Sequence, residues 1–267
     1  MLIIKVGGGK KNNWHYIAED LISLSQREKI IIVHGANEVR AQLANDLNHP
    51  VRNIVSPSGI SSVYTDEKAL DILLMAYAGL TNKRTVALLQ KYGLQAVGLS
   101  GIDGGLWRAK RKKVIYIKEG KKTKLIKGNL TGKVETINTE LVNLLLKNNY
   151  LPVLTTPAIS YENEIVNTDN DFATAVMASQ LKAKKIIYLF EAPGLLKDVY
   201  DDSSLIKEVK KENLEQTLKF GQGRMKKKIL SVRKAFEGGV EKVYFGDGRI
   251  KTPITALLND RGGTVIF

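Results

Sequence analysis

The sequence predicts an α/β protein, a three-layer αβα sandwich in which helices cover both faces of a mainly parallel central sheet. Short apolar runs alternate with helical patterns along most of the 267 residues. A strand, helix, strand order implies right-handed crossovers, and therefore parallel strands that are buried on both faces. The length is sufficient for one large domain or for two lobes.

Strands are expected at six runs that are rich in Ile, Val and Leu and mostly end at Gly, Pro or an acidic residue. These runs are LIIKVGG, KIIIVHG, QAVGLSG, YLPVLTTPAI, KKIIYLFEA and KVYFGDG. Apolar residues at three- and four-residue spacing predict helices over residues 14–28, 66–91, 138–148, 171–182 and 224–237. The polar segment SYENEIVNTDND suggests a boundary near residues 160–168, so we expect lobes of residues 1–165 and 166–267.

Residues 103–136 interrupt this alternation and include the most uneven charge distribution in the chain. Residues 107–127, here called the basic stretch, hold ten Lys or Arg and one acidic residue, and so contribute +9 of the formal net charge of +14. The segment VIYIKEGKKTKLIKG predicts two strands joined at EGKK, a basic β-hairpin that protrudes from the α/β body. Such a charge favours an acidic partner, whether nucleic acid, membrane or another acidic molecule.

The composition disfavours several classes of site. Without cysteine there are no disulfides and no thiolate metal sites, which favours an intracellular, cytoplasmic protein. The three histidines lack the spacing of metal ligands, so no metal held by the protein alone is predicted. The start, MLIIKVGGG, has a strand pattern, and we expect neither a signal peptide nor a transmembrane span.

Two glycine-containing turns follow the first two predicted strands, and both suit an anion. Lys5 lies near the end of the first strand, before the glycines at 7–9, and the second strand is followed by GAN at 35–37. Glycines at the carboxyl ends of parallel strands let backbone N–H groups approach a phosphate, and a lysine adds charge. The pattern is neither a P-loop nor a GxGxxG motif, and a structural turn is at least as frequent a meaning of either segment alone.

Two further segments carry polar residues at the expected starts of helices. NTDND supplies Asn167, Asp169 and Asp171, of which one is needed as a cap, so we expect at least one to face a site. GQGRMKKKIL supplies glycines and three consecutive lysines, one of which is expected to point toward a nucleotide phosphate. Two lysines, an aspartate and glycine turns are typical of phosphoryl transfer, which depends on positioning and charge neutralisation.

These segments, together with GLTNKRTVALL, AVGLSGIDGG and NNYLPVLTTPAI, occur in the order found in the amino acid kinase family. The sequence resembles the acetylglutamate kinase branch of that family from the first strand to about residue 250. The resemblance implies an acceptor-binding N-terminal lobe, an ATP-binding C-terminal lobe and a homodimer formed through the N-terminal lobe. It implies that Lys5 and Lys228 neutralise the transferring phosphoryl group while Asp171 orients both lysines. Further implied positions are Gly8, Gly35, Ala36, Val63 and Asn167 for the acceptor, and Gly7, Glu191, Gly223 and Lys226 for the nucleotide.

Two segments depart from the acetylglutamate kinase pattern. The second glycine run reads GAN, and Val63 stands where those enzymes carry an arginine that binds the α-carboxylate of the free substrate. GLSGIDGGLWRAKRK, YENEIVNTDND and GQGRMKKK instead resemble members of the family that act on an amino acid tethered by its amino group to a small acidic carrier protein. The expected substrate is therefore carrier-linked 2-aminoadipate or glutamate, phosphorylated on its distal carboxylate with ATP and Mg²⁺.

The basic stretch gives this interpretation a physical reason, because complementary charge steers an acidic protein to its partner whereas a free amino acid needs no such array. The predicted carrier contacts are Arg108, Lys110, Arg111, Lys112 and Lys113. One alternative is an acetylglutamate kinase that acts on the free small molecule. Another is a basic nucleic-acid-binding protein, which is disfavoured because the basic stretch contains few aromatic residues. No nucleic-acid or membrane partner is expected.

Overall fold

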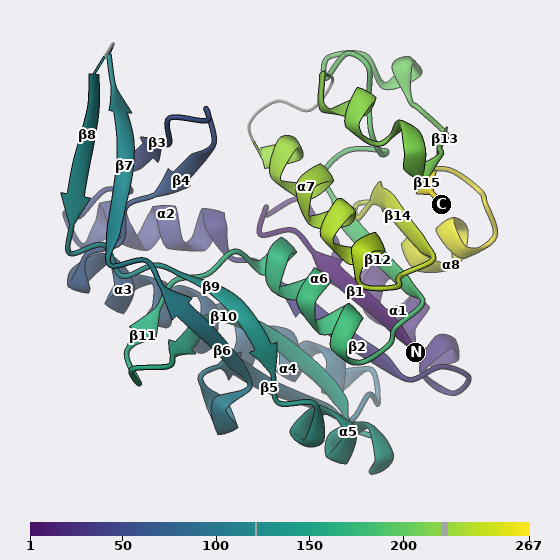
Figure 1. The fold of residues 1–267 in the computed structure, drawn as a ribbon. Helices are drawn as coiled ribbons and strands as arrows, with labels where there is room; N and C mark the ends of the chain where they lie inside the picture. The colour runs from purple at the N-terminus through teal and green to yellow at the C-terminus, as the bar shows by residue number, and fades with distance from the viewer. Residues whose placement is uncertain (121, 220–223) are drawn as a thin grey trace.

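The computed structural model describes the whole chain except residues 121 and 220–223 (Figure 1). Its central sheet contains β1 (Leu2–Val6), β2 (Ile30–His34), β5 (Ala96–Gly101), β6 (Trp107–Arg111), β9 (Gly132–Ile137), β10 (Leu151–Ser160), β11 (Ile165–Val166), β12 (Lys185–Phe190), β13 (Glu208–Val209), β14 (Lys242–Asp247) and β15 (Thr264–Ile266). The strand order is β13-β15-β14-β12-β1-β2-β10-β6-β9, and β5 and β11 also pair with β10. β1 lies parallel to both β2 and β12, and β2 lies parallel to β10, so the prediction of a mainly parallel sheet is confirmed.

Helices cover both faces of this sheet. They are α1 (Trp14–Ser25), α2 (Asn37–Asp46), α3 (Glu67–Leu74), α4 (Asn82–Lys91), α5 (Thr139–Lys147), α6 (Asn170–Gln180), α7 (Arg224–Glu237) and α8 (Pro253–Leu258). A π-helical segment, η1 (Met75–Thr81), joins α3 to α4, so the predicted helix of residues 66–91 changes its winding in the middle. No helix in the described part of the chain is long and apolar enough to cross a membrane.

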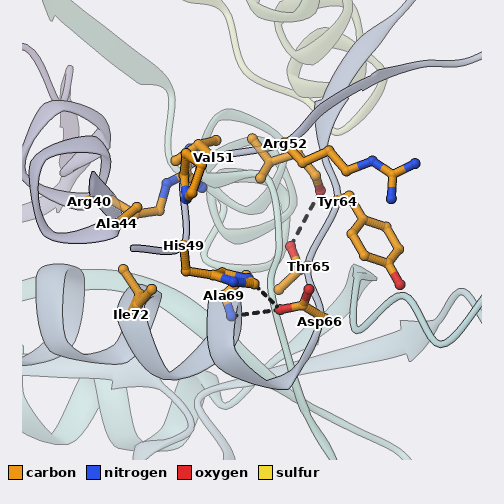
Figure 2. Close-up of a pocket in the computed structure, with 12 residues that line it drawn as sticks. Arg40, Ala44, His49, Val51, Arg52, Tyr64, Thr65, Asp66, Ala69 and Ile72 are labelled. Atoms are coloured by element: carbon orange, nitrogen blue, oxygen red, sulfur yellow. Dashed lines mark hydrogen bonds and ion pairs between the residues drawn. The ribbon is translucent and has the colours of Figure 1, made fainter. Parts of the chain in front are cut away.

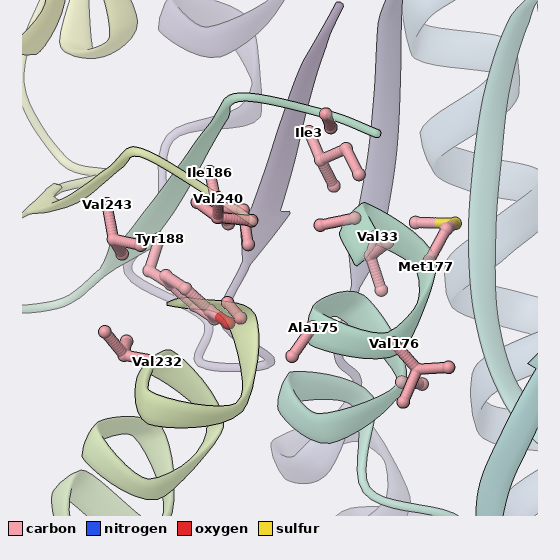
Figure 3. Close-up of a cluster of buried hydrophobic side chains, with 14 of the residues drawn as sticks. Ile3, Val33, Ala175, Val176, Met177, Ile186, Tyr188, Val232, Val240 and Val243 are labelled. Atoms are coloured by element: carbon pink, nitrogen blue, oxygen red, sulfur yellow. The ribbon is translucent and has the colours of Figure 1, made fainter. Parts of the chain in front are cut away.

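Two apolar clusters hold the layers together, one on each face of the sheet. One contains side chains from α5, α6 and α7, and the other contains side chains from α1, α4 and α8. Successive residues of a strand face opposite sides, so Leu2 and Ile4 enter the second cluster and Ile3 enters the first. Figure 3 shows Ile3 in the first cluster together with Ala175 and Met177 of α6. The same alternation directs Lys5 toward the face that α6 and α7 cover.

The basic stretch is divided between two sheets. Residues Trp107–Arg111 form β6 of the central sheet, and Trp107 is fully buried. β7 (Val114–Glu119) and β8 (Lys122–Lys127) pair antiparallel as a separate two-stranded sheet. This sheet rises from one side of the molecule beside another antiparallel pair, β3 (Asn53–Val55) and β4 (Ser61–Val63) (Figure 1). Charge alone therefore did not indicate which residues leave the body of the protein.

One continuous sheet spans the two predicted lobes, because β1 and β2 from the N-terminal half pair through β1 with β12 of the C-terminal half. The boundary expected between residues 165 and 166 falls within β11, which pairs with β10. The division into an acceptor lobe and an ATP lobe stays a prediction.

Candidate active site

Lys5, Asp171 and Lys228 converge near the carboxyl end of β1, where α6 and α7 meet that strand. The Nζ of Lys5 lies 2.8 Å from Oδ1 of Asp171, and the Nζ of Lys228 lies 2.7 Å from Oδ2 of the same carboxylate. None of the three residues is more than 9% exposed. Two buried ammonium groups thus share one carboxylate. Lys5, Asp171 and Lys228, here called the lysine cluster, carry a surplus positive charge that suits an anion.

The charges in the cluster are strongly coupled. Burial by itself raises the pKa of Asp171, but attraction to the Lys228 and Lys5 ammonium groups holds that pKa well below its usual range. Burial likewise opposes the charge of Lys5, yet the attraction of Asp171 outweighs it and the pKa of Lys5 is raised. For Lys228, burial and the repulsion from Lys5 together outweigh the attraction of Asp171, and they lower the pKa of this lysine to about 8. All three groups are therefore charged at neutral pH.

The segment NTDND divides its polar residues among three tasks. Asp169 caps α6, since its Oδ1 accepts hydrogen bonds from the N–H groups of Asp171 and Phe172, each at 3.0 Å. Asp171 points to the two lysines. Asn167 faces the other way, and its Nδ2 donates to Oγ1 of Thr65 at 3.0 Å. The capping interpretation holds for Asp169, whereas Asp171 faces the lysine cluster.

The three consecutive lysines of α7 have different surroundings. Lys228 points inward, with its Nζ 5.6 Å from the ring centre of Tyr188 and 5.8 Å from that of Phe190. Lys227 lies 3.7 Å from Oδ2 of Asp169, and Lys226 is half-buried. Gly223, predicted to bind the nucleotide, lies outside the described residues. One lysine of the run therefore turns into the protein, as the sequence predicted.

The two glycine turns touch each other just beyond the end of β1. A Cβ atom on Gly8 would lie 2.5 Å from the backbone nitrogens of Ala36 and Asn37, and one on Gly35 would lie 2.9 Å from the nitrogen of Gly8. Neither position accepts a side chain without movement of the backbone. Among the described residues, the N–H groups of Gly8, Ala36 and Asn37 donate no hydrogen bond. Unpaired N–H groups at the start of α2 make a suitable cradle for an anion.

Glu191 and Gly7 lie where β12 meets the first glycine turn. Oε1 of Glu191 accepts a hydrogen bond from the N–H of Lys11 at 2.6 Å, and the N–H of Gly7 donates to the carbonyl oxygen of Leu189 at 2.8 Å. A Cβ on Gly9 would lie 2.4 Å from the Glu191 carboxyl group. Glu191 thus holds the turn in place, and a contact of Glu191 or Gly7 with a nucleotide stays a prediction.

Sequence reasoning missed His34, which supports the second glycine turn. This side chain is fully buried, with Nε2 3.0 Å from Nδ2 of Asn82 and Nδ1 3.3 Å from the carbonyl oxygen of Gly35. Burial, together with the charges of Lys5 and Lys83, lowers its pKa to about 4, so the ring is neutral at physiological pH. Asn82 then donates to Nε2, and Nδ1–H donates to Gly35. The sequence signal was a histidine that ends a buried strand directly before a glycine.

Comparisons with known proteins identify the family of the chain. The sequence profile of the amino acid kinase family matches residues 1–247. The chain is 43% identical to the LysW-aminoadipate kinase of Thermus thermophilus over 99% of this chain and 100% of that protein. It is 33% identical to the LysW-aminoadipate/LysW-glutamate kinase of Saccharolobus solfataricus over 100% of this chain and 99% of that protein. The carbamate kinase of Giardia superposes with a TM-score of 0.69 at 13% identity, over 100% of this chain and 98% of that one.

The chain belongs to the amino acid kinase family. Val63, which the resemblance predicts to stand in place of an arginine of the acetylglutamate kinase branch, has a clear location in the structure. Val63 ends β4 and lines a pocket of about 350 Å³ whose other lining residues come from α2, α3 and residues 49–52 and 64–66 (Figure 2). Thr65, the partner of Asn167, lines the same pocket. Two residues predicted to contact the acceptor are thus at or beside one pocket.

The five cations predicted to contact a carrier differ in their exposure and in the partners that they already have. Arg108 Nη1 donates to the carbonyl oxygen of Ser160 and to Asn163, and Arg111 is ion-paired with Glu164. Both arginines are partly buried, whereas the remaining three, Lys110, Lys112 and Lys113, are exposed.

Lys112 is the residue of the basic stretch whose charge is influenced by residues beside the lysine cluster. Although Lys112 is exposed, neighbouring atoms partly desolvate its ammonium group. This desolvation, followed by repulsion from Lys227 and Lys133, lowers the pKa of Lys112 against the attraction of Asp169. Cations from the segment between β6 and β7, from β9 and from α7 are therefore close enough to influence one another. This end of the basic stretch lies near Lys227 and Asp169, the residues adjacent in sequence to Lys228 and at the start of α6.

Proposed function

We propose that this protein is an ATP-dependent kinase that phosphorylates the distal carboxylate of 2-aminoadipate, glutamate or both, while the amino acid is attached through its amino group to a small acidic carrier protein. Family membership supports the kinase activity, and the names of the full-length relatives support the tethered substrate and a role in lysine biosynthesis. A role in arginine biosynthesis would follow if glutamate is also accepted.

The observation that carries the proposal is the buried carboxylate of Asp171 between the ammonium groups of Lys5 and Lys228. Phosphoryl transfer develops charge on the equatorial, attacking and leaving oxygens, and two fixed cations neutralise that charge without reorganisation. Asp171 positions both lysines and keeps them protonated. The N–H groups of Gly8 and Ala36 would bind oxygens at the acceptor end.

The reaction needs no general base, because the acceptor carboxylate is already ionised at neutral pH. One of its oxygens attacks the γ-phosphorus of ATP, and the bond from that phosphorus to the oxygen bridging to the β-phosphate breaks. The electron pair of that bond leaves with ADP, and the product is a mixed anhydride, an acyl phosphate. Lys5 would contact the phosphoryl group from the acceptor side and Lys228 from the nucleotide side.

In this proposal residues 166–267 bind ATP, and residues 1–165 bind the acceptor. Gly7, Glu191, Gly223 and Lys226 are the nucleotide-binding candidates, and Asn167 belongs to the acceptor side. No group of three or more His, Cys, Asp or Glu residues suited to a metal lies in the described part of the chain, and Asp171 is fully engaged by lysines. Mg²⁺ would therefore be held mainly by the phosphates of ATP, whose charge it would neutralise.

The acidic carrier would approach the exposed lysines of the basic stretch, since rim charges raise the association rate of an oppositely charged protein. Lys110, Lys112 and Lys113 are the strongest candidates because they are exposed and Lys112 is close to Lys227. Arg108 and Arg111 would shape this surface from their partly buried positions. Cytoplasmic location and a homodimer formed through residues 1–165 are further parts of the proposal.

The test is an acyl phosphate assay with Mg²⁺–ATP and three acceptors, namely carrier-linked aminoadipate, carrier-linked glutamate and free N-acetylglutamate. Hydroxylamine traps the product as a hydroxamate, which mass spectrometry assigns. We expect product from one or both carrier-linked acceptors and much less from the free acid. Product from free N-acetylglutamate alone would contradict the carrier proposal, and the Lys5→Ala and Lys228→Ala variants are the inactive controls.

A further inference from the structure

The pocket lined by Val63 contains a buried cation with no anionic partner in the described chain. Arg40 extends from α2 into this pocket and is only 8% exposed. Its Nη2 lies 3.5 Å from Oδ1 of Asn37, a distance too long for a strong hydrogen bond, and its buried Nε has no partner. Among the described residues no carboxylate lies within 4.0 Å of its guanidinium group.

A guanidinium group does not lose its proton in proteins, and a desolvated charge without a counter-ion is costly. The carboxylate that lines the same pocket cannot compensate Arg40, because Asp66 is already used. Its Oδ1 is bonded to Nε2 of His49 at 3.0 Å and accepts the N–H of Ala69 at 2.8 Å as the cap of α3. The pocket is therefore electropositive and polar enough to hold an anionic group.

The second arginine of the pocket has a different arrangement. Arg52 is exposed, and its guanidinium carbon lies 5.0 Å from the ring centre of Tyr64. Figure 2 shows Arg52 extending away over Tyr64, whereas Arg40 reaches from α2 toward Val51. Arg52 thus already has a partner and contact with water. Arg40 is the buried cation that still requires an anion.

This pocket adjoins the glycine turns where the reacting carboxylate is expected. Asn37, whose Oδ1 lies 3.5 Å from Nη2 of Arg40, has its backbone nitrogen against Gly8, and the same Oδ1 accepts a hydrogen bond from the hydroxyl of Tyr77 at 2.6 Å. On the opposite wall, Thr65 is bonded to Asn167, which leads into α6 and Asp171. A short chain with one carboxylate at the glycine turns therefore has its other end directed into the pocket.

We propose that Arg40 binds the carboxylate of the substrate that does not receive the phosphoryl group, the α-carboxylate of the tethered amino acid. This inference rests on the proposed function and deepens it, because it makes the enzyme selective for dicarboxylic amino acids. A guanidinium fork matches a carboxylate with two parallel hydrogen bonds, and burial strengthens both. The cation reaches the pocket from α2, while the β4 wall contributes the apolar side chain of Val63.

The test compares two carrier-linked acceptors, 2-aminoadipate and 5-aminopentanoate, which differ only in the α-carboxylate. We expect the wild type to prefer aminoadipate by at least about 30-fold in kcat/KM, the range of one charged hydrogen-bonded contact. In Arg40→Leu this preference should fall to less than threefold, mainly through the KM for aminoadipate. Arg40→Lys should restore part of it. The matched control Arg52→Leu, which removes an arginine of the same pocket, should keep the wild-type preference.

An unchanged preference in Arg40→Leu would overturn the inference while leaving the proposed function intact. A second measurement does not depend on turnover, namely calorimetric titration of each variant with free N-acetyl-2-aminoadipate and N-acetyl-5-aminopentanoate. The wild type and Arg52→Leu should bind the dicarboxylate more tightly, and Arg40→Leu should not. If the wild type forms no acyl phosphate from carrier-linked acceptors, the proposed function fails, and this titration still decides the role of Arg40.

Protein stability separates binding from a structural role. Arg40→Leu replaces an unpaired buried charge by an apolar side chain, so we expect a melting temperature equal to or above that of the wild type. A lower melting temperature with an unchanged preference between the two acceptors would show that Arg40 supports the fold instead, and would overturn the inference.

Discussion

Replacing Asp171 by asparagine is the most informative single change to the lysine cluster, because the amide keeps the shape of the side chain and removes its charge. In the native protein this carboxylate lies 2.8 Å from Lys5 and 2.7 Å from Lys228, and all three groups are nearly buried. Removing one partner of a buried ion pair costs roughly 3–5 kcal/mol in stability. Without that attraction the pKa of Lys228, already lowered to about 8, falls further, and the lysine becomes neutral at physiological pH.

Loss of the Lys228 charge should remove one contact to the transferring phosphoryl group. A contact made mainly in the transition state is worth roughly 3–4 kcal/mol, so we expect kcat to fall about 10²–10³-fold with a smaller change in the KM for ATP. Hydroxamate formation under saturating ATP measures kcat, and urea denaturation measures stability.

The matched control is Asp169→Asn, two residues earlier at the same helix start. Asp169 caps α6 through its Oδ1, and asparagine caps about equally well, so stability and kcat should stay near wild type. If Asp171→Asn keeps a kcat within tenfold of Asp169→Asn, the lysine cluster does not carry the chemistry and the mechanism proposed here is wrong.

Three further predictions concern pH and salt. Because Lys228 must be protonated and its pKa is lowered to about 8, kcat/KM for ATP should fall as the pH rises through about 8, and a profile flat to pH 10 would contradict this. Burial, followed by the charges of Lys5 and Lys83, lowers the pKa of His34 to about 4, compared with 6.5 in the unfolded chain. The neutral ring therefore contributes folding stability that is complete above pH 6.5 and is lost as the pH falls toward 4. The loss should approach roughly 3 kcal/mol, measured by urea denaturation at several pH values, and His34→Gln should lack this part of the pH dependence. Changing Lys110, Lys112 and Lys113 to glutamate should raise the KM for the carrier-linked acceptor at least about tenfold at low ionic strength and less at 0.5 M salt. The same change at the exposed residues Lys182, Lys210 and Lys242 is the control, and equal effects of both triple variants would refute a local docking surface.

The sequence was a good guide to the sheet because the period of two and the long buried runs are strong local signals. All six expected strands lie in the central sheet, and each expected helix overlaps a helix of the structure. The basic stretch was harder, because its lysines and arginines obscured a real alternation in WRAKR. Trp107 and Ala109 are buried, while Arg108 and Lys110 are more exposed, as in a half-buried strand.

The candidate site could be predicted only where the residues lie in recognisable segments. The charge of Asp171 and its place after a cap were visible in NTDND, and its contact with both lysines followed from the resemblance. The pocket could not be predicted: its lining residues lie between positions 40 and 72, but they face one another only once α2, β4 and α3 are packed together. Arg40 looks like an ordinary charged residue of the polar segment NEVRAQLAND, and its burial depends on tertiary packing.

Two sets of cations therefore have different physical tasks. Lys5, Lys228 and Arg40 are buried, so their interactions with a bound anion are strong, directional and little affected by salt. Lys110, Lys112 and Lys113 are exposed, so they act over longer distances and are screened by salt. Variants of the exposed set should consequently change KM by a factor that becomes smaller as the ionic strength rises, whereas variants of the buried set should change kcat or acceptor preference by the same factor at low and high salt. A strong salt dependence of the Arg40→Leu effect would mean that this arginine attracts the carrier and does not bind the tethered carboxylate.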